Sequence, residues 1–226
     1  MEKLYIDKQE VFRYMGHVDG LADDQTVAAV EECIEEVRYV AEARSVFREF
    51  CLVKGRVLIS SHVDVELEGK DIKRHLETCD RIIALAVTLG HGVDRLIRYS
   101  GYTSMSKALA MDACASAAVE ALADRVSSDL ACRFGAEGVF LTSRYSPGYG
   151  DFPIQTQSIL LSMLDAEAKI GITATSNHIL IPRKSITALI GLSDKKCQRG
   201  QLGCEHCRLA QSCLFRKGGM GFDTSR

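Results

Sequence analysis

Residues 144–153 constrain the fold of this chain more than any other segment. They hold two of its three prolines, together with two glycines and three aromatic residues around one arginine and one aspartate. The segment follows a run of β-type residues at 138–142. Pro147-Gly148 predicts a tight turn, because proline fixes φ at about −65° and glycine accepts a positive φ at the next position. Such a turn can hold Arg144, Tyr149 and bare backbone amides around one small polar ligand.

Helical and strand-type patterns are mixed along the chain without a regular alternation. Apolar residues at steps of three and four predict helices over 24–50 and 104–134. β-Branched runs predict strands at 56–60, 63–67 and 81–88, and the last has the continuous apolar pattern of a strand buried on both faces. The shorter patterns predict helices at 70–79, 93–99 and 154–170, and strands at 138–143, 172–175, 179–181 and 186–192. The mixture favours an α+β fold with a mixed or antiparallel sheet and flanking helices over a doubly wound sheet.

The nine cysteines fall into two groups. Five are scattered through apolar contexts and are predicted to be small buried residues: Cys33, Cys51, Cys79, Cys114 and Cys132. The other four lie close together near the C-terminal end: Cys197, Cys204, Cys207 and Cys213.

Clustered cysteines in a chain without a secretion signal indicate a metal site before disulfides. Four thiolates can hold zinc or an iron–sulfur cluster, and the spacing does not select between them. A redox dithiol pair or unliganded thiols are the alternatives. Since the composition also changes after Ser193, we divide the chain into a domain over 1–193 and a Cys-rich metal-binding tail over 194–226.

Charge and hydropathy exclude several classes of protein. A net charge of −2 leaves no basic field, which disfavours nucleic acid as a partner. No apolar run reaches the roughly 18 residues of a membrane span, and the first residues lack the apolar region of a signal peptide. We therefore expect a cytoplasmic protein that does not enter a membrane.

The pattern Arg-x-x-Pro-Gly-Tyr-x-x-x-Pro at 144–153 resembles the signature of the reactivation domain of cobalamin-dependent methionine synthase, which binds S-adenosylmethionine. Further matches lie at 5–7, 120–125, 164–171 and 181–185. The resemblance implies a methionine synthase activation domain-like fold, and it places Arg144 and Tyr149 in the S-adenosylmethionine cleft. Taken without the resemblance, Arg144 is a surface or salt-bridging arginine and the segment a plain turn.

The chemistry of S-adenosylmethionine indicates a role for each candidate residue. Arg144 suits its carboxylate through paired charge-assisted hydrogen bonds. Glu120 suits its ammonium group, because this acid stands alone on a small, apolar helix stretch where a buried carboxylate needs a cation. Asp7 is a further candidate from the match at 5–7. The predicted cofactor-binding residues are Asp7, Glu120, Arg144, Ser146, Gly148 and Tyr149.

One part of the family pattern is missing. Larger members carry an aromatic segment after the Pro182 region that helps to hold the adenine, whereas this chain continues from Leu192 into polar residues and cysteines. Adenine binding therefore needs a substitute here, or the ligand differs.

The resemblance implies a stand-alone reactivation module within a cobalamin-dependent methionine synthase or methyltransferase system. Such a module binds S-adenosylmethionine and presents its methyl group for reductive remethylation of a cobalt(II) corrinoid. The chain has no Asp-x-His-x-x-Gly motif, so the cobalamin is expected on a partner, a corrinoid-binding methyltransferase protein, with a flavodoxin- or ferredoxin-type reductase as electron donor.

Two other functions stay open at this point. The first is an electron-transfer adaptor that binds a corrinoid protein and uses an iron–sulfur cluster without S-adenosylmethionine. The second is a zinc-stapled protein of unrelated role, for which a shared fold would be only an analogy.

Overall fold

The computed structural model describes residues 4–16, 22–60 and 63–195. Its helices are α1 (Lys8–Tyr14), α2 (Asp24–Val40), α3 (Lys70–His75), α4 (His91–Thr103), α5 (Met105–Gly135), α6 (Thr156–Leu164) and α7 (Ala166–Ile170). Its strands are β1 (Arg44–Val53), β2 (Arg56–Ser60), β3 (Val63–Glu66), β4 (Arg81–Thr88), β5 (Phe140–Leu141), β6 (Thr173–Ala174), β7 (Leu180–Ile181) and β8 (Ser185–Ser193).

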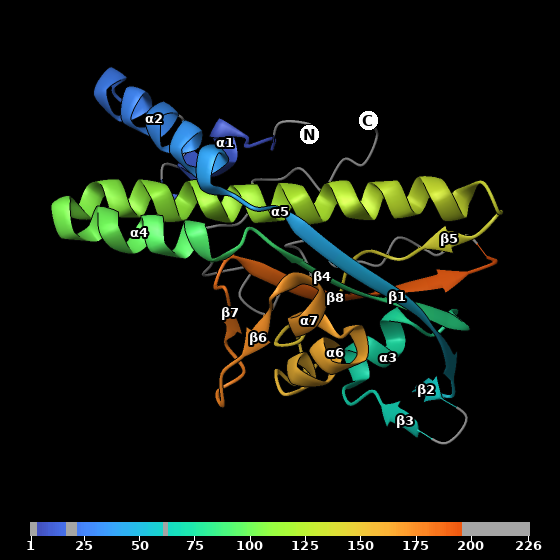
Figure 1. The fold of residues 1–226 in the computed structure, drawn as a ribbon. Helices are drawn as coiled ribbons and strands as arrows, with labels where there is room; N and C mark the ends of the chain where they lie inside the picture. The colour runs from blue at the N-terminus through green and yellow to red at the C-terminus, as the bar shows by residue number, and fades with distance from the viewer. Residues whose placement is uncertain (1–3, 17–21, 61–62, 196–226) are drawn as a thin grey trace.

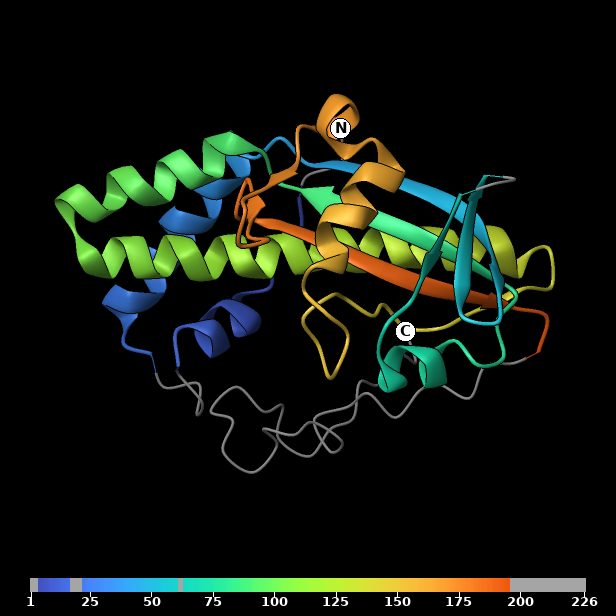
Figure 2. The same ribbon diagram turned by 90° about the horizontal axis from the view of Figure 1, so that it is seen from below.

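Six of the strands form one antiparallel sheet in the order β3-β2-β1-β4-β8-β5, and β6 and β7 form a separate pair. The long helices α4 and α5 lie on one side of the sheet, with α1 and α2 packed on α5 (Figure 1). The shorter helices α3, α6 and α7 lie on the other side, as Figure 2 shows from below. The structure confirms the expected α+β class and the antiparallel sheet with flanking helices.

Helices on both faces of the sheet explain the apolar pattern of β4. This strand pairs with β1 and with β8 over its whole length. Ile83 and Leu85 join the core beneath α2, α4 and α5, whereas Ile82 and Ala84 join the core beneath α3, α6 and α7. All four side chains are fully buried, so the strand over 81–88 is buried on both faces as predicted.

The long helix α5 is the central helix of the larger core. The Ser104 hydroxyl caps it by accepting a hydrogen bond from the backbone N–H of Lys107 at 3.2 Å. Its buried face consists mainly of alanine, which lets α1, α2 and α4 approach closely. The helix predicted over 104–134 is therefore confirmed, and it forms the platform on which one side of the candidate site is built.

The helix predicted over 24–50 is wrong in its second half. It ends at Val40, and residues 44–53 form β1 instead. Phe50 and Leu52 are both buried, which is the two-residue period of a strand. Backbone pairing with the distant strand β4, and with β2 in a hairpin, selects this conformation over the local helical pattern.

Two other expected elements differ from the structure. The helix expected over 93–99 is longer, because α4 runs from His91 to Thr103, and Gly92 lies in its first turn against the carbonyl oxygen of Val40. The helix expected over 154–170 breaks at Asp165, whose left-handed φ of 53° separates α6 from α7. The remaining short elements lie where the patterns predict them, although β5 covers only two residues.

The prediction that the scattered cysteines are buried holds for only part of the group. Cys33 and Cys114 are buried, and desolvation raises the pKa of the Cys114 thiol to about 12. Cys79 is half-buried. Cys51 and Cys132 are exposed, because they lie on the solvent-facing sides of β1 and α5. For these two the expectation is wrong.

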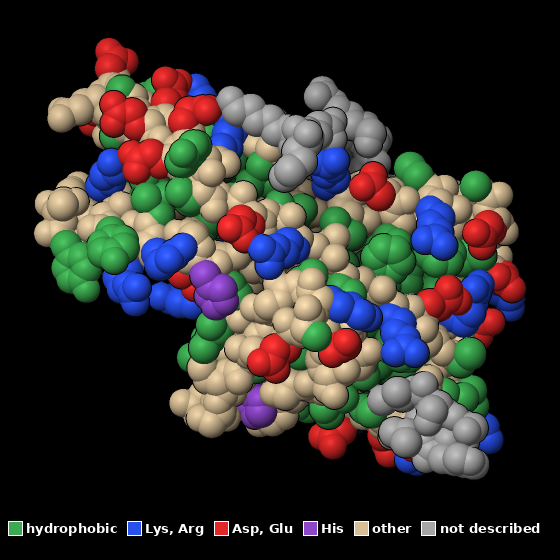
Figure 3. All heavy atoms as spheres, viewed as in Figure 1, with side chains coloured by type: hydrophobic (Ala, Val, Ile, Leu, Met, Phe, Trp, Pro, Cys, Tyr) green, Lys and Arg blue, Asp and Glu red, His purple; other side chains and the backbone are tan. Residues whose placement is uncertain are grey.

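Acidic side chains gather over α2, at the upper left of Figure 3. The helix carries Glu31, Glu32, Glu35 and Glu36, and the Glu36 carboxylate accepts a hydrogen bond from Lys107 Nζ on α5 at 2.7 Å. This surface repels a phosphate backbone. Among the described residues, no helix is both long enough and apolar enough to cross a membrane.

Candidate functional site

Arg144 lies against one face of α5 and is held there by two carboxylates. Its Nη2 atom is 3.0 Å from Glu120 Oε2, and its Nη1 atom is 2.8 Å from Asp124 Oδ1. Nη1 also donates to Ser127 Oγ at 3.3 Å. The three partners are spaced four and three residues apart, so they lie on one side of the helix. Only 18% of the Arg144 side chain is exposed.

Glu120 is partly buried in this cluster, with 45% of its side chain exposed. Desolvation raises the pKa of its carboxyl group, and the nearby charge of Asp124 adds to this effect. The guanidinium groups of Arg144 and Arg13 act in the opposite direction. Burial has the larger effect on this pKa, although the Glu120 carboxylate already pairs with Arg144.

A hollow of about 280 Å³ opens beside this carboxylate, between α5 and the segment that leads into α1. The lining residues are Tyr5, Asp7, Glu10, Ala117, Glu120, Ala121 and Asp124. The Asp7 side chain caps α1 by accepting a hydrogen bond from the backbone N–H of Gln9 at 2.8 Å. Four of the seven lining residues are acidic, and the Arg144 guanidinium is bonded to two of them, Glu120 and Asp124.

The loop after Arg144 is ordered by its own backbone. Tyr145 exchanges two hydrogen bonds of 2.9 Å with Leu189 of β8, which ties the loop to the sheet. Gly148 has a φ of +91°, which requires glycine, and its N–H donates to the carbonyl of Phe152 at 2.9 Å. Phe152 itself is buried in the second core. The tight turn predicted at Pro147-Gly148 is thus present.

The predicted site residues separate into two groups in space. Asp7 and Glu120 line one hollow, and Arg144 contacts Glu120 directly. Ser146, Gly148 and Tyr149 follow Arg144 on its loop and do not line that hollow, and 67% of Tyr149 is exposed. Contact of all six residues with one ligand stays a prediction.

Sequence reasoning missed two members of the Arg144 cluster. Asp124 and Ser127 are not among the predicted site residues. Their spacing of four and seven residues from Glu120 on a predicted helix indicates that all three lie on one side of it. Tyr5 and Glu10 were also missed, because their place beside α5 depends on how the N-terminal segment packs.

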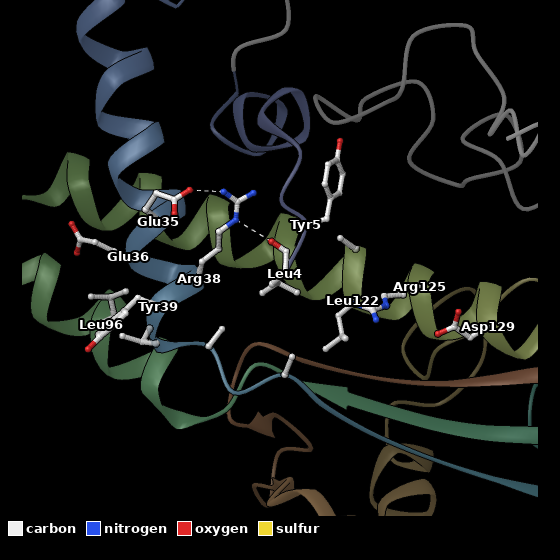
Figure 4. Close-up of a pocket in the computed structure, with 14 residues that line it drawn as sticks. Leu4, Tyr5, Glu35, Glu36, Arg38, Tyr39, Leu96, Leu122, Arg125 and Asp129 are labelled. Carbon is white, nitrogen blue, oxygen red and sulfur yellow. Dashed lines mark hydrogen bonds and ion pairs between the residues drawn. The ribbon is translucent and has the colours of Figure 1, made fainter. Parts of the chain in front are cut away.

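A second, larger hollow of about 1390 Å³ lies on the other side of the N-terminal segment (Figure 4). It shares Tyr5 and Ala121 with the smaller hollow. Along its wall, Arg38 donates from Nε to the carbonyl of Leu4 at 3.0 Å and pairs with Glu35 at 2.5 Å. The Arg38 contacts anchor the N-terminal segment that forms the partition between the two hollows.

The four clustered cysteines Cys197, Cys204, Cys207 and Cys213 lie outside the described residues. Within residues 4–16, 22–60 and 63–195, no group of three or more His, Cys, Asp or Glu side chains is arranged to hold a metal ion. A metal at the clustered cysteines stays a prediction.

The comparisons with known proteins agree with this fold. The family described as vitamin B12-dependent methionine synthase, activation domain, matches residues 70–199, which is more than half of the chain. The crystal structure of the MetH reactivation domain bound to AdoHcy is similar with a TM-score of 0.60 and 15% sequence identity, over 80% of this chain and 69% of that chain. This likeness confirms the expected activation domain-like fold. No curated protein sequence matches the chain.

Proposed function

The chain belongs to the family of vitamin B12-dependent methionine synthase activation domains, and on that basis we propose that it binds S-adenosylmethionine at the Arg144 cluster. There it presents the methyl group of that ligand to a corrinoid carried by a partner protein. The observation that carries the proposal is the convergence of a guanidinium and several carboxylates beside one hollow.

The donor set fits the amino-acid end of S-adenosylmethionine. The Arg144 guanidinium can take the ligand carboxylate through two charge-assisted hydrogen bonds, in exchange for its contact with Asp124. The ligand ammonium can pair with the carboxylate of Glu120, with Asp7 on the opposite wall of the hollow. These opposite preferences orient the zwitterion in one direction and so fix where its sulfonium methyl points.

The contribution of this chain to the methyl transfer is positioning. A corrinoid, when bound to its partner protein, supplies the cobalt nucleophile that accepts the methyl group once a reductase has delivered one electron. Holding the sulfonium methyl in one orientation reduces the orientational freedom that has to be lost before methyl transfer, which lowers the entropic part of the activation barrier. The corrinoid-binding methyltransferase and a flavodoxin- or ferredoxin-type reductase are the proposed partners.

Calorimetry with Arg144→Ala tests the proposal directly. The wild-type chain should bind S-adenosylmethionine and also AdoHcy, which the similar MetH reactivation domain is bound to. Removing two charge-assisted hydrogen bonds of roughly 1.5 kcal/mol each should weaken binding by on the order of a hundredfold.

Arg56→Ala is the matched control, because Arg56 also pairs with a carboxylate, Asp64 on β3, at 2.5 Å. That variant should bind both ligands as the wild type does. Equal affinity of Arg144→Ala and wild type would remove the assignment of Arg144, and a wild type that binds neither ligand would remove the proposed function.

A further inference from the structure

The short helix α3 has no cap from its own sequence. Gly69 stands at its N-cap position with a φ of +109° and supplies no side chain. The cap comes instead from the Arg144 loop, where Asp151 accepts the backbone N–H of Lys70 at 2.7 Å and that of Asp71 at 3.0 Å. One carboxylate thereby satisfies two helix N–H groups that would otherwise lack a partner within the helix.

The other end of α3 holds the beginning of the same loop. His75 Nε2 lies 2.9 Å from the carbonyl oxygen of Ser143, and the His75 ring packs against the Tyr145 ring with centroids 5.2 Å apart. Burial lowers the pKa of His75. Because a carbonyl oxygen can only accept, the neutral ring donates through its Nε2–H.

Two glycines make this close contact possible. A Cβ at Gly69 would lie 2.8 Å from Asp151 Oδ1 and 2.9 Å from the Asp151 carbonyl oxygen. A Cβ at Gly150 would lie 2.6 Å from Asp71 Oδ2 and 2.6 Å from the Tyr145 hydroxyl. Gly69 cannot carry a side chain because its Cβ would meet the backbone of the loop, and at Gly150 a Cβ would displace the Asp71 and Tyr145 side chains. Helix and loop are therefore in close contact at both glycines.

We propose that Asp151, acting through α3, is a positioning residue for the loop that carries Arg144, Ser146, Gly148 and Tyr149. The two attachments, at Asp151 and at Ser143, lie on either side of the four predicted ligand residues. Asp151 thus reduces the conformational freedom of the loop before a ligand arrives, which favours affinity through preorganisation. The assignment of these loop residues to a ligand rests on the proposed function above.

The test compares the loss of two helix caps, of which only one connects its helix to the Arg144 loop. Asp151→Ala removes the cap of α3, and the control Asp23→Ala removes the cap of α2, where the Asp23 carboxylate accepts the backbone N–H of Thr26 at 2.7 Å. Asp151→Asn keeps one acceptor oxygen and serves as a conservative variant. Ligand affinity is measured by calorimetry with S-adenosylmethionine and AdoHcy at a temperature where all variants are folded.

We expect Asp151→Ala to weaken ligand binding about tenfold. The affinity of Asp151→Asn should lie between those of Asp151→Ala and the wild type, and Asp23→Ala should bind as the wild type does. Wild-type affinity in Asp151→Ala would overturn the proposal, because the cap would then be structural only. Equal weakening in Asp151→Ala and Asp23→Ala would overturn it as well.

Amide hydrogen exchange separates this proposal from the proposed function. Without any ligand, Asp151→Ala should raise exchange at residues 143–153, including the Gly148 amide, whereas Asp23→Ala should raise exchange in α2 only. If the wild type binds neither ligand but this pattern appears, the proposed function fails and the positioning of the loop by Asp151 stands. If exchange at 143–153 is unchanged in Asp151→Ala, the positioning role is excluded whatever the wild type binds.

Discussion

At the scale of single residues, the shifted pKa of Glu120 makes the stability of the fold depend on pH. The folded pKa of Glu120 is raised above the ordinary value of 4.5, first by desolvation and then by Asp124. Between pH 4.5 and the folded pKa, the Glu120 carboxyl group is therefore protonated in the folded chain to a greater extent than in the unfolded chain. The stability contributed by this group is fully present below pH 4.5 and is lost as the pH rises through the folded pKa.

Glu120→Gln should remove this dependence. The free energy of unfolding of the wild type, relative to that of the variant, is expected to fall as the pH rises from 4.5 through the folded pKa of Glu120. Urea unfolding at a series of pH values measures the difference. Glu32→Gln, which also removes one carboxylate, on the exposed side of α2, is the control. A flat difference for Glu120→Gln would contradict the account of its environment.

At the scale of secondary-structure elements, the contact between β8 and the segment that follows α3 depends on Gly191. A Cβ at this position would lie 2.4 Å from Cys79 Sγ and 2.8 Å from Leu76 Cδ2. Both atoms belong to the segment that follows α3 and are packed tightly against the strand. Overpacking of this kind costs roughly 1–3 kcal/mol, so Gly191→Ala should lower the free energy of unfolding by about that amount.

The control for this substitution is Gly135→Ala at the end of α5. An added Cβ there meets no atom within 4 Å, so stability should be unchanged or slightly raised. Denaturant unfolding of the two variants distinguishes them. Equal stability of Gly191→Ala and the wild type would show that α3 can shift away from β8 without cost.

At the scale of the whole molecule, the four C-terminal cysteines predict a second functional unit. We propose that residues 1–193 form the activation domain and that residues 194–226 form a metal-binding tail, which lies outside the described residues apart from its first two. Replacing both Cys204 and Cys207 by serine should release bound zinc or iron, because two of four thiolate ligands are lost.

Metal analysis of anaerobically purified protein measures this release, and visible absorbance distinguishes an iron–sulfur cluster from zinc. The double replacement of Cys51 and Cys132, which are exposed cysteines of the domain, should leave the metal content unchanged. A normal metal content after replacement of Cys204 and Cys207 would refute the metal site.

Many of the helices and strands could be predicted from local sequence patterns. The strand over 81–88 could be predicted because a strand buried on both faces has a continuous run of apolar residues. The helix over 104–134 could be predicted because its apolar residues recur at helical spacing over many turns. Residues 44–53 could not, since their strand depends on pairing with β4, whose partner residues lie 30 to 44 positions away in the sequence. Local propensity loses to such long-range pairing whenever both conformations suit the side chains.

Some features of the candidate site could likewise be predicted from the local sequence, and others could not. By itself, the sequence determined that Arg144 sits on a tight turn, and that Glu120 is a single acid within a small, apolar stretch of helix. Only the tertiary structure decided that Asp124 and Ser127 share the Arg144 guanidinium and that Asp151 caps α3. The physical reason is that turn and helix preferences arise between neighbouring residues, whereas ion pairs and shared caps form only when packing brings distant segments together.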